Sequence, residues 1–171
     1  MKRLFVWSAI LSLFIDQVAK TLAYGMLDMH VPVKVIGEFV RFARTSNVRG
    51  LFGMSYGPPW IYFVLPVLGM ALVIWFALRS PDRWHSITYG IILGGALGNL
   101  IDRIRVGHVI DFIDVGIGPT RWYTFNPADM FIICGVIMLL AREFLWRKKP
   151  ADLAPAAPEV AEGSDAPNLP R

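Results

Sequence analysis

Four of the thirteen acidic residues of this chain lie within residues 98–129, a stretch that is otherwise mostly apolar. Two of them stand beside hydrophobic residues, Asp111 in VIDFI and Asp129 in NPADMF. A carboxylate in such surroundings costs free energy, so an acid found there usually has a function. Two carboxyls that share one proton can activate water and protonate a leaving amine. We therefore interpret Asp111 and Asp129 as a candidate pair for peptide-bond hydrolysis.

Asp102 and Asp114 are rival members of such a pair. Asp102 precedes Arg103, which favours a structural or substrate-binding ion pair, and Asp114 follows Asp111 by three residues without a comparable frame. Asp129 comes just after Asn126-Pro127, a sequence typical of a helix start. There the helix dipole favours a carboxylate, whereas the apolar neighbours of Asp111 favour its neutral form. Spacing by itself leaves the choice of pair open.

The composition is that of a membrane protein. Hydrophobic residues make up 55% of the 171 residues, charged residues make up 18%, and the mean hydropathy is +0.50. The net charge is +4, and the basic residues stand mostly at the ends of apolar runs, where they would meet lipid headgroups. We therefore expect membrane lipid and not nucleic acid as a partner.

The apolar runs predict four transmembrane helices, at about 4–23, 60–78, 85–103 and 127–146. The segment FVRFAR (39–44) alternates apolar and basic residues, which predicts a short strand in the loop 24–59, and a second loop covers 104–126. We expect an all-α membrane protein with a small loop and β-strand subdomain on its outer face, formed by residues 1–149. Residues 150–171 are rich in Ala and Pro, which predicts a disordered tail.

Four helices place both termini on one side of the membrane. The opposite loops also contain basic residues, namely Lys34, Arg41, Arg44, Arg49, Arg103, Arg105 and Arg121. The basic residues are denser in the short segments at the helix ends on the side of the termini, which predicts that this side is cytoplasmic: Lys2, Arg3, Arg79, Arg83, Arg147, Lys148 and Lys149. A group of polar residues then converges on the outer face: Asp16, Asn47, Asn99, Asp102, Asp111, Asn126 and Asp129. This convergence predicts a single site there.

Two helical patterns could position that site. Asp16 and Lys20 are four residues apart, so an ion pair explains both, and the same pair could brace the site from the first helix. Gly90, Gly94 and Gly98 form a stripe on which another helix can pack closely, and Asp102 continues the same spacing.

Metal and thiol chemistry find no support in the sequence. The three histidines have no metal-ligand spacing, so we predict no metal and no cofactor. The single cysteine, Cys134, lies in an apolar run without a nearby base, and we interpret it as a small packing residue.

Several blocks together resemble those of the bacterial lipoprotein signal peptidases, or signal peptidase II. These blocks are DQVAK (16–20), GGALGNLIDR (94–103), HVIDFI (108–113) and FNPADM (125–130). The resemblance covers residues 4 to about 146. It implies an aspartyl endopeptidase of the bacterial inner membrane with four helices. Such an enzyme cuts the signal peptide from a prolipoprotein, just before a cysteine that carries diacylglycerol.

The resemblance also implies roles for single residues. Asp111 and Asp129 match the catalytic aspartates. The residues that match substrate-binding or supporting positions are Asp16, Lys20, Asn47, Asn99, Asp102, Arg103, Asn126 and Ala128. The implied partners are the lipidated prolipoprotein, membrane lipid and the cyclic peptide inhibitor globomycin. One block departs from the family pattern N-x-G-x-A-F, because residues 47–52 read NVRGLF.

Two alternatives belong to other functional classes. A proton-coupled carrier would use Asp16, Lys20, Asp102 and Asp129 as a relay, but the acids cluster at one face and do not cross the membrane. An assembly protein would use the glycine stripe and leaves the acids unexplained. A carrier should depend on acids at several depths, an assembly protein on the glycines, and a peptidase on Asp111 and Asp129.

Overall fold

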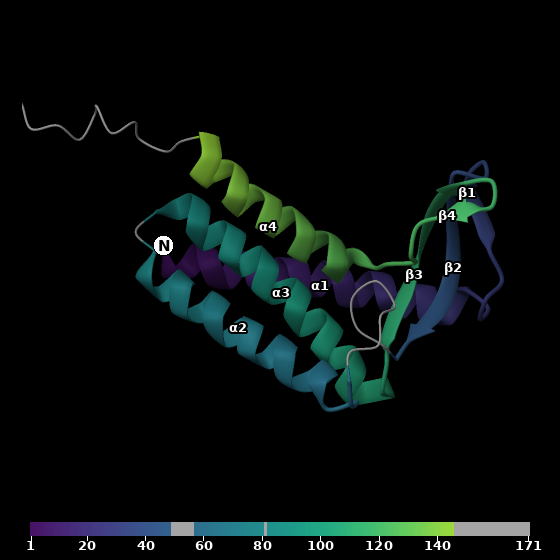
Figure 1. The fold of residues 1–171 in the computed structure, drawn as a ribbon, viewed down its shortest axis with the longest axis horizontal. Coiled ribbons are helices and arrows are strands. Elements are labelled where there is room, and N and C mark those ends of the chain that lie inside the picture. Colours follow the sequence, from purple (N-terminus) through teal and green to yellow (C-terminus); the bar gives the residue numbers. More distant parts are fainter. Residues whose placement is uncertain (49–56, 81, 146–171) are drawn as a thin grey trace, which may run out of the picture.

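The computed structural model describes residues 1–48, 57–80 and 82–145, and contains four helices and four strands in that part of the chain (Figure 1). The helices are α1 (Lys2–Met26), α2 (Ile61–Arg79), α3 (Arg83–Val106) and α4 (Pro127–Leu145). The strands are β1 (Val33–Ile36), β2 (Val40–Asn47), β3 (Val109–Ile117) and β4 (Thr120–Arg121). Four transmembrane helices and a small β subdomain were predicted; the four helices and the β subdomain are confirmed, and two of the four helices have the length and composition of a membrane span. The predicted tail, 150–171, lies outside the described residues.

The helices run side by side, with the sheet at one end of the bundle and the start of α1 at the other (Figure 1). Within the described residues, α1 and α2 are long and apolar enough to cross a membrane, and α3 and α4 are not. The reason lies in their polar residues, which include Asn99 and Asp102 on α3 and Asp129 on α4. Because α3 packs against each of the other three helices, much of its surface needs no apolar side chain for lipid.

The glycine stripe of α3 makes this central position possible. A Cβ atom at Gly90 or Gly94 would collide with Ser8 or Ser12 of α1, and one at Gly98 would collide with the carboxylate of Asp16. The stripe therefore lets α1 approach α3 closely, as the spacing of small residues predicted. The contact brings the polar end of α1 against the polar end of α3.

The four strands form one antiparallel sheet in the order β1-β2-β3-β4. The strand predicted at 39–44 is confirmed as the first part of β2. A register shift between Phe42 and Thr45 breaks the pairing of β2 with β3, and beyond it Thr45 lies opposite Asp111. Such a bulge turns the bulged strand locally and re-aims its side chains.

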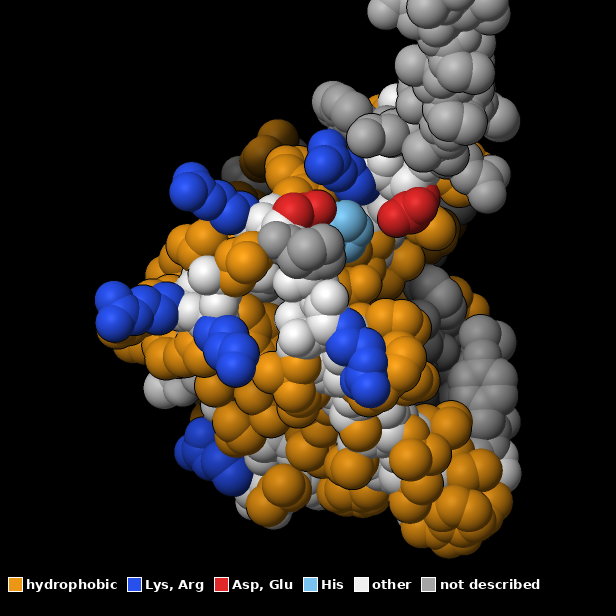
Figure 2. All heavy atoms as spheres, turned by 90° about the vertical axis from the view of Figure 1, so that its left-hand side faces the viewer, with side chains coloured by type: hydrophobic (Ala, Val, Ile, Leu, Met, Phe, Trp, Pro, Cys, Tyr) orange, Lys and Arg blue, Asp and Glu red, His pale blue; other side chains and the backbone are white. Residues whose placement is uncertain are grey.

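Basic side chains gather at the end of the bundle that lies away from the sheet (Figure 2). Lys2, Arg3, Arg79 and Arg83 are exposed at the helix ends that meet there. Within the described residues these four make no ion pair, and Arg79 lies over the ring of Trp75 at 4.1 Å. Cations beside an aromatic ring at helix ends are typical of the headgroup level of a membrane.

Candidate active site

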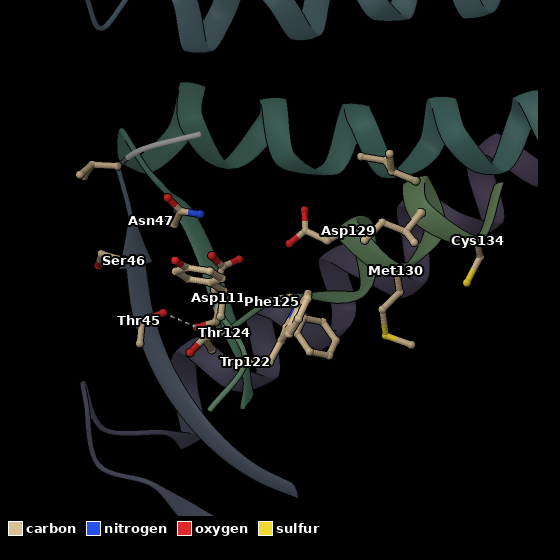
Figure 3. Close-up of a pocket in the computed structure, with 14 residues that line it drawn as sticks. Thr45, Ser46, Asn47, Asp111, Trp122, Thr124, Phe125, Asp129, Met130 and Cys134 are labelled. Atoms are coloured by element: carbon tan, nitrogen blue, oxygen red, sulfur yellow. Dashed lines mark hydrogen bonds between the residues drawn. The ribbon is translucent and has the colours of Figure 1, made fainter. Parts of the chain in front are cut away.

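Asp111 and Asp129 line one cavity of about 750 Å³ between the sheet and the start of α4. Asp111 lies on β3, and Asp129 lies in the first turn of α4. Their carboxylates point into the same space (Figure 3). The two acids that were paired on their sequence surroundings are thus neighbours in the fold.

Two asparagine amides connect the two carboxylates. Asn126 Nδ2 donates to Asp111 Oδ1 at 2.6 Å, and Asn99 Nδ2 donates to Asp129 Oδ1 at 2.8 Å. Asn126 Nδ2 also lies 3.2 Å from Asn99 Oδ1, so the two amides are joined. The chain Asp111–Asn126–Asn99–Asp129 therefore holds both carboxylates in fixed orientations.

The start of α4 fixes Asp129 through its own backbone. Asn126 Oδ1 accepts a hydrogen bond from the N–H of Asp129 at 3.1 Å, and Asp129 Oδ2 accepts one from the N–H of Asn126 at 3.3 Å. This reciprocal arrangement is a capping box, and it confirms that Asn126 caps the helix. Asp129 is therefore held by the same bonds that begin α4.

A buried lysine connects α1 to this network. Lys20 Nζ lies 2.9 Å from Asp16 Oδ2 and 2.9 Å from Asp102 Oδ2, and it donates to Asn99 Oδ1 at 2.8 Å. Lys20 is 1% exposed and Asp16 is 0% exposed. The ion pair predicted between Asp16 and Lys20 is confirmed. Asp102 pairs with Lys20 and not with its neighbour Arg103, because successive side chains of a helix point in different directions.

Asp16 also reaches α4 directly. Its Oδ1 accepts a hydrogen bond from the N–H of Ala128 at 2.9 Å, and Ala128 is fully buried. Asp102 Oδ2 similarly accepts the N–H of Ile110, next to Asp111, at 3.2 Å. The two acids therefore contact the backbone beside each member of the aspartate pair, which supports the bracing role that the sequence predicted.

The other predicted residues lie around the same network. Asn47 lines the cavity and hydrogen-bonds the side chain of Asp111. Arg103 Nη1 donates to the carbonyl of Asn99 at 3.2 Å, and both residues line a second cavity of about 350 Å³ between α2, α3 and α4. Residues 49–52, where the sequence departs from the family pattern, lie outside the described residues.

Sequence reasoning missed two participants. Gln17 Nε2 lies 3.2 Å from Asp16 Oδ2, 3.3 Å from Asp102 Oδ1 and 3.3 Å from the carbonyl of Gly98, so it joins α1 to α3. Its position next to Asp16 in DQVAK was the available signal. Thr45 donates to the carbonyl of Asp111 at 3.4 Å, and no sequence signal points to it, since the bulge in β2 places it.

Cys134 is exposed and lines the first cavity, so its interpretation as a packing residue is wrong. The error arose because an apolar run does not reveal which of its faces remains uncovered. Among the described residues, no group of three or more His, Cys, Asp or Glu side chains is arranged to hold a metal ion.

Burial raises the pKa of Asp111 from its ordinary 3.8 to about 7, and the nearby charge of Asp129 adds to the effect. Hydrogen bonds from Asn126 and Asn47 act in the opposite direction and are outweighed. Asp111 is only 2% exposed, which explains why burial is the largest cause. At neutral pH this carboxyl is therefore poised to hold or release a proton.

This shift predicts a pH-dependent stability. Because the folded pKa of Asp111 is about 7, the folded chain binds a proton that the unfolded chain has lost above its ordinary 3.8. Its contribution to stability is fully present below about pH 4 and is lost as the pH rises through 7. Asp111→Asn stays neutral, so its Tm should exceed that of wild type by about 3–5 °C at pH 8 and equal it at pH 4. A thermal unfolding series in detergent checks this, and an equal gain at both pH values would contradict it.

Comparison with known proteins decides the family. Residues 8–145 match the family model described as signal peptidase (SPase) II. The chain belongs to the signal peptidase II family. The resemblance drawn from the four sequence blocks is thereby confirmed, and with it the prediction of a bacterial membrane enzyme that is an aspartic peptidase.

Individual relatives agree with this assignment. The lipoprotein signal peptidase of Mycolicibacterium smegmatis is 36% identical over 145 residues, which are 81% of this chain and 60% of that protein. The lipoprotein signal peptidase of Hydrogenovibrio crunogenus is 37% identical over 154 residues, covering 83% of this chain and 85% of that protein. The lipoprotein signal peptidase of Pseudomonas fluorescens is 36% identical over 152 residues, covering 84% of this chain and 89% of that protein.

A solved structure shares the fold of this signal peptidase II family member. It is a bacterial membrane enzyme determined by the in meso method at 2.3 Å, with a TM-score of 0.73 and 26% identity. The alignment covers 85% of this chain and 92% of that one. Family and fold together favour the peptidase over the carrier and assembly-protein alternatives.

Proposed function

We propose that this protein removes the signal peptide from prolipoproteins whose cysteine carries a diacylglyceryl group, and that it cuts just before that cysteine. Asp111 and Asp129 activate water and protonate the leaving amine. The observation that carries this proposal is the pair of carboxylates, each held by an asparagine amide, that face one cavity at the end of the helices.

The two carboxyls have different surroundings, and this difference supports separate roles for them. Asp129 accepts bonds from Asn99 and from the N–H of Asn126 at a helix N-terminus, which favours the carboxylate. Asp111 is buried against apolar neighbours and holds the shared proton in the resting enzyme.

The reaction then runs in two steps. Asp129 takes a proton from water as the water oxygen attacks the scissile carbonyl carbon, and Asp111 gives its proton to the carbonyl oxygen. When the C–N bond breaks, the proton on Asp129 passes to the amine nitrogen, and the hydroxyl proton returns to Asp111. Both carboxyls regain their starting states, so protons balance over one turnover.

The buried network supports this chemistry by fixing amide orientation. Asn99 Oδ1 accepts from Lys20 and from Asn126, so Asn99 Nδ2 is left to face Asp129. Lys20 is fixed in turn by Asp16 and Asp102. We propose that Asp16, Lys20, Asn99, Asp102 and Asn126 are positioning residues for the aspartate pair, together with Ala128, whose N–H bonds Asp16.

The cavities suit the two apolar parts of the proposed substrate. The first is lined mainly by large apolar side chains that suit a signal peptide: Trp122, Tyr123, Phe125, Met130, Ile132 and Ile133. The second lies between α2, α3 and α4, where Leu65, Met70 and Ile92 suit an acyl chain. Arg103 and Asn99, which also line the second cavity, would contact the glyceryl esters. Asn47 would contact the substrate from the sheet, and globomycin would bind in the same space.

The charge distribution supports an orientation in the inner membrane. The exposed cations at the end opposite the sheet favour a cytoplasmic location for both termini (Figure 2). The aspartate pair and the sheet would then lie at the periplasmic face, where prolipoproteins arrive.

The experiment that tests the proposal compares one prolipoprotein with and without its diacylglyceryl group. Purified protein in detergent should cleave the lipidated form, as seen by gel mobility, and mass spectrometry should find the modified cysteine at the new N-terminus. The unlipidated form should react at least about 100-fold more slowly, because the lipid contributes binding energy near the reacting bond. Equal cleavage of both forms would contradict the lipid requirement. Cleavage of neither by folded protein would contradict the proposed substrate.

A further inference from the structure

Asp114 is a buried acid that the proposed chemistry does not use. Its Oδ2 accepts hydrogen bonds from Arg41 Nε at 2.9 Å and Arg41 Nη2 at 2.6 Å, and its Oδ1 accepts one from Arg121 Nε at 2.9 Å. Burial acts to raise the pKa of Asp114, but the bonds from Arg121 and Arg41 outweigh it and hold that pKa below its ordinary value. A carboxylate bound on both oxygens by guanidinium groups is a poor proton carrier and a strong tether.

Arg121 connects Asp114 to the segment that lines the cavity. Besides its bond to the Asp114 side chain, its Nη1 donates to the carbonyl of Glu38 at 2.7 Å and its Nη2 to the carbonyl of Asp114 at 3.2 Å. Arg121 therefore joins β4 to β3 and to the turn before β2. The residue that follows it is Trp122, the first residue of the loop 122–125.

The loop 122–125 forms one side of the cavity that contains the aspartate pair. All four of its residues line the cavity, and Trp122, Thr124 and Phe125 can be followed in Figure 3. Trp122 and Tyr123 are 62% and 60% exposed. The backbone anchors the loop at both ends, because Trp122 N–H donates to the carbonyl of Val115 at 2.8 Å and Phe125 N–H to that of Ile113 at 3.0 Å. Both acceptors lie on β3, directly beside Asp114.

We infer that Asp114 is a positioning residue for substrate binding, because it holds the loop 122–125 in place through Arg121. It sets how tightly the apolar part of the substrate is bound, and the aspartate pair sets the rate of bond cleavage. This inference rests on the proposed function, because the loop 122–125 lines the cavity in which the proposed substrate would bind. It also explains why an acid three residues from Asp111 takes no part in the chemistry.

The inference predicts a separation of KM from kcat. Asp114→Asn and Arg121→Gln should each raise KM for the lipidated prolipoprotein about tenfold, the effect of losing one hydrogen bond to a charged group. The kcat should stay within about twofold, because Asp111 and Asp129 keep all their own partners. The double variant should have the KM of either single variant, since both changes break the same ion pair between Arg121 and Asp114.

Arg41→Gln is the matched control. It removes the other guanidinium from the same carboxylate, but Arg41 lies on β2 and not beside the loop. Its Tm should fall about as much as that of Arg121→Gln, while KM should change less than about twofold. A tenfold rise in KM for Arg41→Gln would mean that general loosening of the sheet explains the effect, and would overturn the inference.

A second measurement needs no substrate. Amide hydrogen exchange at Trp122 and Phe125, whose N–H groups bond to β3, should become about tenfold faster in Asp114→Asn and Arg121→Gln than in wild type and Arg41→Gln. Unchanged exchange in all variants would overturn the inference, as would an unchanged KM. If wild-type protein cleaved no prolipoprotein, the proposed substrate would fail, while the exchange result would still decide the role of Asp114 in holding the loop.

Discussion

Asp111→Asn and Asp129→Asn are each expected to lower kcat for prolipoprotein cleavage by about a thousandfold or more, while the protein still folds and inserts. Asparagine keeps the shape of aspartate but can neither accept the proton of water nor donate one to the scissile bond. Asn126 and Asn99 donate to these carboxylates at 2.6 and 2.8 Å, and in the variants they could still donate to the amide oxygen of the new asparagine. The loss should therefore be a loss of chemistry and not of structure.

The measurement is single-turnover cleavage of lipidated substrate by wild type, both single variants and the double variant. Because the two carboxyls act as one unit, the double variant should be no slower than the slower single variant. Lys34→Met, which changes an exposed residue of β1 that has no proposed role in the site, serves as the control and should keep its kcat. Cleavage by either variant at more than about a tenth of the wild-type rate would contradict the assignment of the pair.

Lys20→Met is expected to destabilise the folded protein by about 3–5 kcal/mol, the largest stability effect we predict. Methionine fills similar space, but it leaves the carboxylates of Asp16 and Asp102 without the cation that lies 2.9 Å from each. It also removes the donor to Asn99 Oδ1, on which the orientation of that amide depends. Activity should fall with stability, because Asn99 contacts Asp129.

Denaturant or thermal unfolding in detergent measures this change. Lys34→Met is the matched control, because Lys34 forms an ion pair with Glu38 but is 67% exposed, so its loss should leave the stability close to that of wild type. Adding Asp16→Asn and Asp102→Asn to Lys20→Met should restore part of the stability, since the unpaired charges are then gone. Asp16→Ala should lower the Tm more than Asp129→Asn does. A Tm for Lys20→Met within about 2 °C of wild type would rule out a central structural role for the lysine.

Local patterns in the sequence predicted the parts of the site that depend on neighbours along the chain. The spacing of Asp16 and Lys20 predicted their ion pair, and Asn126-Pro127 predicted the cap that holds Asp129. The glycine stripe predicted the close contact between α1 and α3. In each case a single helix turn or a helix face decides the geometry, so a short stretch of sequence contains the information.

The remaining contacts join residues that are distant in sequence. Lys20 meets Asp102, and Arg41 meets Asp114, only because the helices and strands pack in one particular register. The bulge in β2 that places Thr45 opposite Asp111 has no sequence signature of its own. The central position of α3 was equally hidden, because hydropathy shows that a helix is less apolar but not which neighbours cover it.

One turnover of lipidated prolipoprotein in water labelled with ¹⁸O shows which oxygen attacks the scissile carbonyl carbon. If water held between Asp111 and Asp129 attacks the scissile carbonyl carbon, the new C-terminal carboxylate of the released signal peptide carries the label, and the peptides that contain Asp111 and Asp129 carry none. A released signal peptide without the label, with label in either aspartate, would contradict the account, because the enzyme's own carboxylate would then have attacked the substrate.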